Sequence, residues 1–521
     1  MQKAVFHYGE SRLSIGLALE ICRRKRKGLL SAAAKERILR SQQLVERIIE
    51  KDEIVYGVNT GFGPLCNVRI SGKDTRKLQH NLLISHSVGV GEFIDSDLAK
   101  LMLILKVHAL AHGYSGITLR TIERMLWFIE NDIIPCVPEQ GSVGASGDLA
   151  PLAHLFLPLI GWGHVFYHGN KKAAIEVLRE YDMKPLQLEA KEGLALINGT
   201  QFMSALGVRA AEKLQNCLDH ADIIAAMNLE AMLGSAKPFN AGLHQLRPYD
   251  GCLYVAHRMR KLLKGSEILD SHAHCGQVQD PYSLRCIPQV HGASRNAWRH
   301  LKESLHIEIN SVTDNPILFD EETVVSGGNF HGQPIALPLD YATLAAAELG
   351  NIADRRIYLS LEGKAEGVPM LLMQDTGLNS GFMIPQYTSA ALVSENKSLC
   401  FPASADSIPT SLGQEDHVSM GSISARRVLQ VTTNLEKILG IELLCAAQGF
   451  DFRKPLKSTR FLNLCHNYIR SRIQFAEVDR YFYEDMKLAI QMIRDKELIQ
   501  IINKEAGDEF TNEKHEVFGI Y

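Results

Sequence analysis

Apolar residues recur at helical spacing over long stretches in the second half of the chain. One series consists of Val428, Val431, Leu435, Ile438 and Cys445. A second consists of Leu206, Ala210, Leu214, Cys217 and Ala221. Residues three or four apart lie on one face of an α-helix, so each series predicts a long helix with a buried side. We therefore predict a mainly α fold, in which residues 201–521 form a bundle of long antiparallel helices.

Composition agrees with this fold and limits the partners. Hydrophobic residues make up 46% of the 521 residues and aromatic residues only 7%, which suits a helical globular protein. We predict a smaller N-terminal lobe over residues 1–200 that joins the bundle in one unit. The formal net charge of -3 gives no electrostatic reason to expect nucleic acid or an acidic membrane surface as a partner. The basic run at residues 23–27 is then interpreted as a solvated helix end.

The expected location follows from the absence of targeting signals. The first residues contain no charged segment followed by an apolar signal core, and no stretch has the ~18 apolar residues of a membrane span. Outside an oxidising compartment cysteines stay reduced. We therefore expect a cytoplasmic protein whose ten cysteines are free thiols.

Local patterns place loops and helices in the remaining segments. Three glycines and a proline mark residues 56–64 as a loop. Apolar periodicity predicts a helix over residues 97–111 and a short buried helix over residues 148–160, with Asp148 near the N-terminus of the latter. Residues 317–325 are typical of a small hairpin. Two prolines interrupt regular structure before residue 141, so residues 141–147 are predicted to form a turn.

The turn at Ala145-Ser146-Gly147 permits unusual chemistry. Because glycine has no Cβ, the amide nitrogen of Gly147 can approach the carbonyl carbon of Ala145 closely. Loss of water would close a five-membered ring. Dehydration of Ser146 would then leave an exocyclic methylene, an electrophile that no standard side chain provides. The tripeptide by itself favours a simpler interpretation, a flexible loop without modification.

Other protein classes fit the motifs less well. A hydrolase nucleophile elbow requires Gly-x-Ser-x-Gly, but Gly147 follows Ser146 directly. The glycine spacing over residues 141–147 also differs from the Gly-x-Gly-x-x-Gly fingerprint of dinucleotide sites. Residues 271–275 (SHAHC) suggest a metal site, but no second cluster has zinc spacing. A scaffold or binding protein in which the turn never cyclises is the non-enzymatic alternative.

Five segments together carry a family resemblance. They are residues 56–63 (YGVNTGFG), 144–152 (GASGDLAPL), 193–200 (GLALINGT), 279–286 (QDPYSLRC) and 327–331 (GGNFH). In this order, over nearly the whole chain, they resemble the aromatic amino acid ammonia-lyases. In that family the Ala-Ser-Gly turn becomes 4-methylideneimidazol-5-one (MIO). The resemblance thus implies that Ala145, Ser146 and Gly147 form MIO autocatalytically, and we expect no metal or nucleotide cofactor.

The substrate prediction rests on Glu415. Residues 414–420 (QEDHVSM) resemble the members of the family that act on histidine, whereas tyrosine and phenylalanine lyases generally have an amide at the position of Glu415. A carboxylate suits an imidazole, which donates a charge-assisted hydrogen bond to it, better than a phenyl ring. The resemblance implies non-oxidative deamination of L-histidine to trans-urocanate and ammonia, the first step of histidine degradation. Tyrosine or phenylalanine deamination is the alternative. Two positions depart from the family pattern, His291 and Phe401.

The resemblance also implies a role for each matched residue. The methylene derived from Ser146 captures the substrate amine, and Tyr56 takes the β-proton. The ordinary tyrosine pKa of about 10 is too high for this, so positive charge or helix N-termini near Tyr56 must lower it. Tyr282 and Glu415 complete the implied catalytic set. The implied substrate-binding residues are His86, Asn198, Gln279, Arg285, Phe330 and Glu415.

Family members build each site from several subunits. The resemblance therefore implies a homotetramer with active sites shared between subunits. Arg285 would hold the substrate carboxylate through two parallel hydrogen bonds, while His86 and Glu415 would hold the imidazole.

Overall fold

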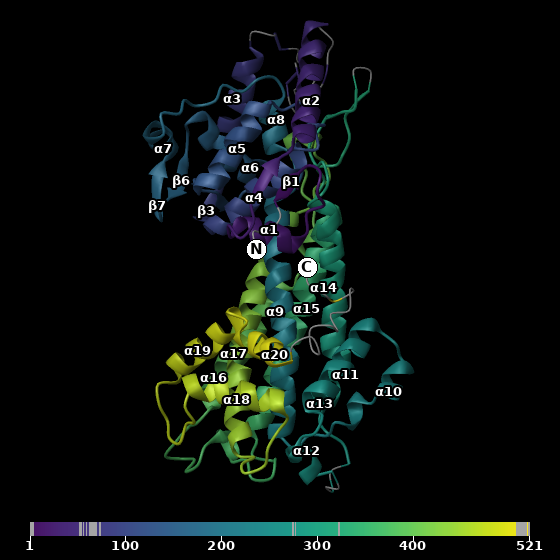
Figure 1. Ribbon diagram of the computed structural model, residues 1–521, viewed down its shortest axis with the longest axis vertical. Coiled ribbons are helices and arrows are strands. Elements are labelled where there is room, and N and C mark those ends of the chain that lie inside the picture. Colours follow the sequence, from purple (N-terminus) through teal and green to yellow (C-terminus); the bar gives the residue numbers. More distant parts are fainter. Residues whose placement is uncertain are drawn as a thin grey trace.

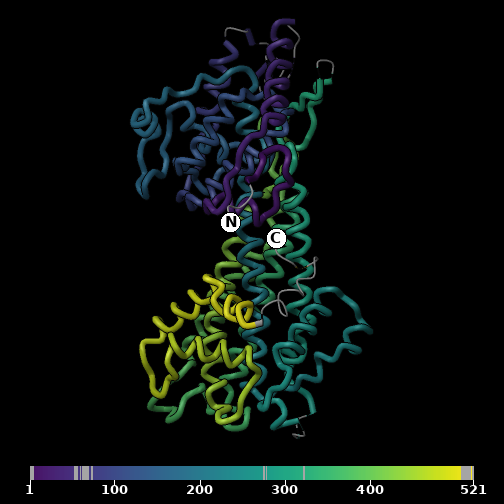
Figure 2. Tube along the Cα trace, viewed as in Figure 1, coloured from purple at the N-terminus to yellow at the C-terminus, as the bar shows by residue number. Residues whose placement is uncertain are grey.

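The structure is a computed structural model that describes residues 5–51, 55, 57–58, 60–61, 70–71, 74–273, 276, 278–320, 323–506 and 518. A lobe formed mainly by N-terminal residues occupies the upper end in Figure 1, and two groups of helices occupy the lower end. Long helices join the two ends through a narrow waist, which the Cα trace in Figure 2 shows most clearly. The predicted mainly α fold with a long helical bundle is confirmed.

Short helices and small sheets build the N-terminal lobe. Its helices are α1 (Ile15–Cys22), α2 (Ala32–Glu50), α3 (Thr75–His86), α4 (Ser96–Leu110), α5 (Leu119–Asn131), α6 (Leu149–Phe156), α7 (Ala174–Glu180) and α8 (Glu192–Ile197). Its strands are β1 (Phe6–Tyr8), β2 (Gly28–Leu30), β3 (Val90–Phe93), β4 (Ile134–Pro135), β5 (Pro138–Gln140), β6 (His164–Tyr167) and β7 (Asn170–Ala173). Strands β1 and β2 pair in parallel, whereas β3–β5 and β4–β6–β7 are antiparallel.

The helices predicted in this lobe are confirmed. Helix α4 covers the predicted 97–111 segment, and its residues from Leu98 to Leu110 are all buried. The predicted 148–160 helix is α6 followed by a 3₁₀ turn at Leu157–Ile160. The predicted hairpin is the pair β8 (Ile317–Leu318) and β9 (Val324–Val325). These elements are specified by local apolar spacing and turn residues, which the sequence shows directly.

Four long helices form the bundle. They are α9 (Gln201–Ala231), α14 (Ile287–Glu308), α15 (Gln333–Leu361) and α17 (Gly421–Asp451). Helices α9 and α15 both pack along α17, and α14 packs against α9 and α15. Both predicted apolar series are buried. The sequence predicted one buried side for each helix, but α9 is buried on nearly all sides because its neighbours surround it.

The long helices α9, α15 and α17 begin at the same place. Phe202 and Met203 in the first turn of α9 donate their backbone N–H groups to Asp148. The α17 N-cap, Met420, donates its N–H to the carbonyl of Val143 at 2.9 Å. A Cβ on the α15 N-cap, Gly332, would lie within 3 Å of side chains of Met203 and Ser419. Three positive helix ends therefore meet beside residues 141–148, whereas α14 runs the opposite way and ends beside α9 at Glu308. Of these four helices, α14 alone is antiparallel to the other three, whereas the sequence predicted antiparallel helices throughout.

The lower end holds the remaining helices. They are α10 (Ala241–Gln245), α11 (Asp250–Leu263), α12 (Glu267–Ser271), α13 (Tyr282–Arg285), α16 (Met383–Leu399), α18 (Arg460–Arg472), α19 (Phe482–Arg494) and α20 (Glu497–Ala506). In Figure 1, α10–α13 lie on one side of the bundle and α16 and α18–α20 on the other. Within the described ranges no helix is long and apolar enough to cross a bilayer, and the cysteines are free thiols. The predicted division at residue 200 stays a prediction.

Candidate active site

The turn at residues 141–148 connects β5 to α6 and requires glycine at position 147. Gly147 has a φ of +75°, which disfavours other residues, and a Cβ there would lie 2.1 Å from the carbonyl oxygen of Gly199. The next residue, Asp148, donates its N–H to that oxygen at 2.7 Å. The turn therefore packs closely against the peptide at Gly199. A tight turn is what ring closure at Ala145-Ser146-Gly147 requires.

Asn198 holds the carbonyl oxygen of Ser146. This residue follows the last turn of α8 and is buried, and its side-chain amide donates to the Ser146 oxygen at 2.7 Å. The N–H of Gly199 points at the same oxygen from 3.5 Å. Two donors on one carbonyl withdraw electron density from it. Asn198 and Ser146 are thus brought together as the sequence predicts.

Behind Asn198 lies a buried lysine. Lys106, on α4, donates from Nζ to the carbonyl oxygen of Asn198 at 2.5 Å. Burial lowers the pKa of Lys106 to about 7, and the negative charge of Asp314 partly opposes that shift. The lysine fixes the backbone from which the Asn198 amide reaches Ser146. Sequence reasoning missed Lys106, although a lysine inside the largely apolar 97–111 segment was a signal.

Asp148 lies at the N-terminus of α6, as predicted, but its side chain caps another helix. Its side chain makes no capping bond to α6. Instead the carboxylate accepts the N–H groups of Phe202 and Met203 at 3.1 and 3.0 Å, and the hydroxyl of Ser142 at 3.1 Å. Burial raises the pKa of Asp148 to about 7 even though these three donors oppose the shift. The carboxylate thus anchors the turn to the N-terminus of α9, a contact that local sequence spacing does not reveal.

Glu415 lies against Ser146, 269 residues away along the chain. The Ser146 hydroxyl donates to Glu415 Oε1 at 2.7 Å. The hydroxyls of Thr410 and Ser411 donate to Oε2 at 2.8 and 2.9 Å. Ser419 fixes this segment further, since its hydroxyl donates to the Gly144 carbonyl at 3.0 Å. The sequence predicted Ser146 and Glu415 as site residues, and the fold places these two side chains in direct contact.

His86 and Phe330 belong to the same end of the molecule. His86 ends α3, and its Nδ1 lies 3.0 Å from the Ser85 hydroxyl. Burial lowers the pKa of His86, while a backbone carbonyl and the negative charge of Glu415 act to raise it. Phe330 is half-buried and precedes His331, whose ring stacks on that of His417 at 5.8 Å. The negative charge of Glu415 therefore acts on His86. Residues 327–331 approach the segment that carries Glu415, since His331 contacts His417.

The other predicted residues are not brought to this cluster within one chain. Tyr282 and Arg285 form the ends of α13, with Gln279 just before it, and α13 lies at the lower end in Figure 1 whereas α6 lies at the upper end. The Arg285 guanidinium lies over the Tyr282 ring, 4.5 Å from its centre. Within the described ranges, Arg285 Nε is buried without a hydrogen-bond partner. Tyr56 lies outside the described residues.

The family assignment comes from comparison with known proteins. The model of the aromatic amino acid lyase family matches residues 13–471 of the chain. The chain belongs to this family. It is an enzyme of the MIO-dependent class, in agreement with the resemblance in the five segments.

Named relatives support the assignment. The histidine ammonia-lyase of Deinococcus radiodurans is 50% identical over 459 residues, which cover 88% of this chain and 87% of the relative. The crystal structure of histidine ammonia-lyase from Trypanosoma cruzi is similar with a TM-score of 0.90 at 38% identity, covering 99% of this chain and 98% of that one. A tyrosine aminomutase from Streptomyces globisporus has a TM-score of 0.91 at 34% identity, covering 96% and 99%. Proteins that are named for different amino acids share this fold, so the residues of the site must distinguish the substrates.

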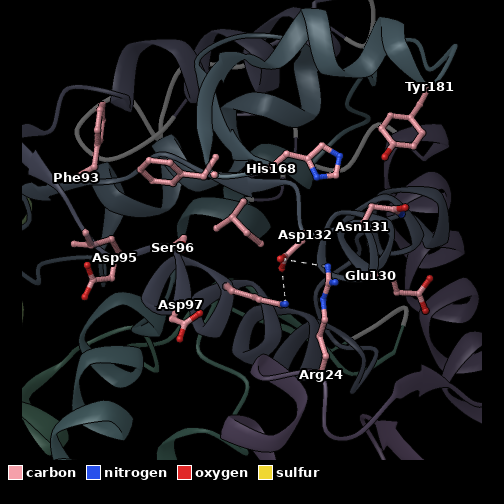
Figure 3. A pocket seen from close by; sticks show the side chains of 15 residues that line it. Arg24, Phe93, Asp95, Ser96, Asp97, Glu130, Asn131, Asp132, His168 and Tyr181 are labelled. Carbon is pink, nitrogen blue, oxygen red and sulfur yellow. Dashed lines mark hydrogen bonds and ion pairs between the residues drawn. The ribbon is translucent and has the colours of Figure 1, made fainter. Parts of the chain in front are cut away.

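A separate cavity of about 640 Å³ lies in the N-terminal lobe, beside β3, β6 and the end of α5 (Figure 3). At its wall Asp132 pairs with Lys100 at 2.6 Å and with Arg24 at 3.3 Å. Among the predicted site residues that the structure describes, none lines this cavity. These three charges pair with one another, and the cavity is distinct from the cluster around Ser146.

The SHAHC segment has a structural use for its first histidine. The two ring nitrogens of His272 lie 2.8 and 3.1 Å from the carbonyl oxygens of Ile268 and Gly234. His274 and Cys275 lie outside the described residues. In the part of the chain that the structure describes, no group of three or more histidine, cysteine or acidic side chains is arranged to hold a metal ion. Phe401, the second departure from the family pattern, is exposed, and its carbonyl accepts from Arg427.

Proposed function

We propose that this enzyme eliminates ammonia from L-histidine to give trans-urocanate, and that MIO forms autocatalytically from Ala145-Ser146-Gly147. The observation that carries the proposal is the contact between the Ser146 hydroxyl and the Glu415 carboxylate at 2.7 Å. It places the residue expected to select the substrate ring beside the residue expected to become the electrophile. The relatives named above as histidine ammonia-lyases support histidine as the substrate.

The residues around Ser146 fit the MIO group. Only glycine is tolerated at position 147, and the Ser146 carbonyl, which becomes the ring carbonyl, already has donors in Asn198 and Gly199. The group supplies an electrophilic methylene that takes up an amine. Donors on the conjugated carbonyl increase that electrophilic character. Asn198, held by Lys106, is therefore the residue that tunes the reactivity of the turn.

Glu415 has an acceptor that maturation sets free. Oε2 keeps the hydroxyls of Thr410 and Ser411, whereas the donor to Oε1 among the described residues is the Ser146 hydroxyl. Dehydration of Ser146 removes that hydroxyl and leaves Oε1 without its donor. An imidazole N–H replaces the lost donor, while the phenyl ring of phenylalanine has none to offer. This exchange of donors is the physical reason to prefer histidine over phenylalanine.

The remaining roles belong to a second copy of the chain. Tyr282, Arg285 and Gln279 lie at the far end of the bundle from Ser146, so one chain alone offers the amine-binding end or the carboxylate-binding end of a site (Figure 1). A buried guanidinium nitrogen that has no hydrogen-bond partner among the described residues suits Arg285 to a substrate carboxylate. We propose a homotetramer in which subunits share active sites. Tyr56 acts as the β-proton base, and Phe330 lines the pocket.

Substitution of Ser146 by alanine tests the electrophile. We expect deamination to collapse while the helical circular dichroism and the oligomeric mass stay unchanged, because the change removes one hydroxyl. Purified wild-type protein is incubated with L-histidine, L-tyrosine and L-phenylalanine, and the near-ultraviolet absorbance of each product is followed. Coumarate or cinnamate as the main product would replace histidine by the tyrosine or phenylalanine alternative. Activity that survives in Ser146→Ala would exclude MIO.

Complementation tests the shared site. Ser146→Ala and Arg285→Ala each disable one end of every site, so each variant alone is expected to be inactive. Co-expressed, the two variants form mixed oligomers in which some sites receive both an intact Ser146 and an intact Arg285. Activity that returns on co-expression supports subunit sharing. Activity in a monomer, or no recovery of activity in oligomers shown to contain both variants, would contradict it.

A further inference from the structure

We infer that His291 is a positioning residue that holds α13, and with it Arg285, through the side chain of Arg356. This inference rests on the proposed function of Arg285 as the carboxylate clamp. His291 is one of the two positions that the sequence comparison by motif singled out. It lies on α14, one turn beyond α13, and is fully buried. The chain has thus placed a polar ring in its core, which requires polar partners.

Both ring nitrogens of His291 have a partner. Nδ1 lies 2.9 Å from Asp222 Oδ1, and Nε2 lies 3.3 Å from Arg356 Nη1. A guanidinium only donates, so Nε2 accepts and Nδ1 carries the proton that goes to Asp222. One neutral tautomer satisfies both contacts. In agreement, burial lowers the pKa of His291 to about 4.

Arg356 connects this ring to α13. Its Nε and Nη2 donate to the two oxygens of Glu442 at 2.5 and 3.2 Å. Nη1 is left with two hydrogens, and it faces His291 Nε2 at 3.3 Å and the carbonyl oxygen of Ser283 at 3.4 Å. Ser283 lies in α13 between Tyr282 and Arg285. The orientation of one guanidinium is thus shared between the buried histidine and the backbone that carries the clamp.

On its other side, the His291 ring contacts Asp222, which is itself held by two arginines. Asp222, on α9, accepts from Arg295 at 2.5 Å and from Arg258 at 2.8 Å. Burial alone would raise the pKa of Asp222, but Arg295, His291 and Arg258 together hold it well below the usual range. The carboxylate is therefore a fixed negative charge at the centre of the bundle. Hydrogen bonds run from it through His291 and Arg356 to α13.

Helix α13 is a single turn that packs against α14 and α15, so the hydrogen bond from the Arg356 side chain contributes to its position. Its backbone hydrogen bonds are local. Two residues before its first residue, the carboxylate of Asp280 accepts the N–H of Ser235 at 2.7 Å. Leu284 is buried and would meet a Cβ placed on Gly234 at 3.2 Å. Neither contact restrains the carbonyl of Ser283. Without the acceptor on His291, Arg356 keeps its pair with Glu442 but loses the second contact that directs Nη1 toward Ser283, so the 3.4 Å bond to that carbonyl is weakened.

Two substitutions separate positioning from packing. His291→Leu keeps side-chain bulk and removes both hydrogen bonds, whereas His291→Gln keeps a neutral group with an acceptor that reaches Arg356. His220→Leu is the matched control, because His220 is equally buried on α9 and contacts the Asn216 carbonyl rather than Arg356. The probes are urocanate, which has the carboxylate, and histamine, which has the imidazole and amine but no carboxylate. Their affinities for the full-length oligomer are measured by calorimetry.

We expect His291→Leu to weaken urocanate about tenfold, and to raise the KM for L-histidine by a similar factor, because a displaced clamp loses oriented contacts. Histamine affinity is expected to stay at the wild-type value, His291→Gln to recover urocanate binding, and His220→Leu to change neither. Equal loss for both probes, or no recovery in His291→Gln, would overturn the inference. If His291→Leu does not fold, His291→Asn, too short to reach Arg356, is expected to show the same selective loss.

The calorimetric measurement does not require turnover. Wild-type protein that deaminates no L-histidine counts against the proposed function. Protein that deaminates L-histidine but shows no selective urocanate loss in His291→Leu counts against His291 alone. The two failures are therefore distinguishable.

Discussion

Glu415→Gln is the sharpest test of substrate selection. Glutamine has the same shape but no charge. Its oxygen still accepts one hydrogen bond at the Oε1 position, where Ser146 donates at 2.7 Å in this structure. Its NH₂ group only donates, so the hydroxyls of Thr410 and Ser411 must turn and accept instead. Both hydroxyls can rotate, and we expect the fold to be kept.

The magnitude follows from the change in hydrogen-bond type. A hydrogen bond to a charged acceptor contributes about 1–2 kcal/mol more than one to a neutral acceptor. With tenfold for each 1.4 kcal/mol, kcat/KM for L-histidine is expected to fall by a factor of roughly 5 to 30. L-Phenylalanine makes no such bond, so its kcat/KM is expected to stay constant or rise.

The assay measures both amino acids on the same preparation of wild type and Glu415→Gln. Product absorbance in the near ultraviolet gives the rates, and the ratio of the two kcat/KM values cancels differences in the fraction of matured enzyme. The expected result is a fall in the histidine-to-phenylalanine ratio. A ratio that does not change would refute the imidazole contact, even if both absolute rates fell together.

Further expectations concern the turn and the buried histidines. Gly147→Ala is expected to abolish activity and to lower stability, because its Cβ would lie 2.1 Å from the Gly199 oxygen; a fully active variant would contradict the tight turn. The unfolding free energy is expected to fall from pH 6.5 toward pH 4, because three buried histidines have a pKa near 4 in the folded state, below the unfolded value of about 6.5, so the unfolded chain binds more protons in this window. At pH 5.5 each of these histidines is expected to lower the unfolding free energy by about 1.4 kcal/mol. In denaturant titrations the fall for His220→Leu should therefore be smaller than the wild-type fall by that amount. A fall equal to that of the wild type would contradict the assignment. The three residues are His108, His220 and His291.

Much of the scaffold was predictable because it depends on local spacing. Helices α4, α9 and α17 and the β8–β9 hairpin follow from apolar periodicity and turn residues within a few turns of chain. The chemistry of Ala145-Ser146-Gly147 is also local, since it requires only that these residues be adjacent. Asp148 shows the limit of such reasoning. Sequence spacing placed it at the start of α6, where it lies, but did not show that its carboxylate caps α9, whose first turn lies more than fifty residues further on.

The sequence by itself determined which helices form, which turn can cyclise, and which residue types are present to bind an imidazole and a carboxylate. The tertiary structure decided which of them meet. It brought Glu415 onto Ser146 and Lys106 behind Asn198, and it buried His291 between Asp222 and Arg356. It also left Arg285 at the opposite end of the bundle (Figure 1). The physical reason is that periodicity records only whether a side chain is buried, while the partner of a buried polar group is set by the packing of helices distant in sequence.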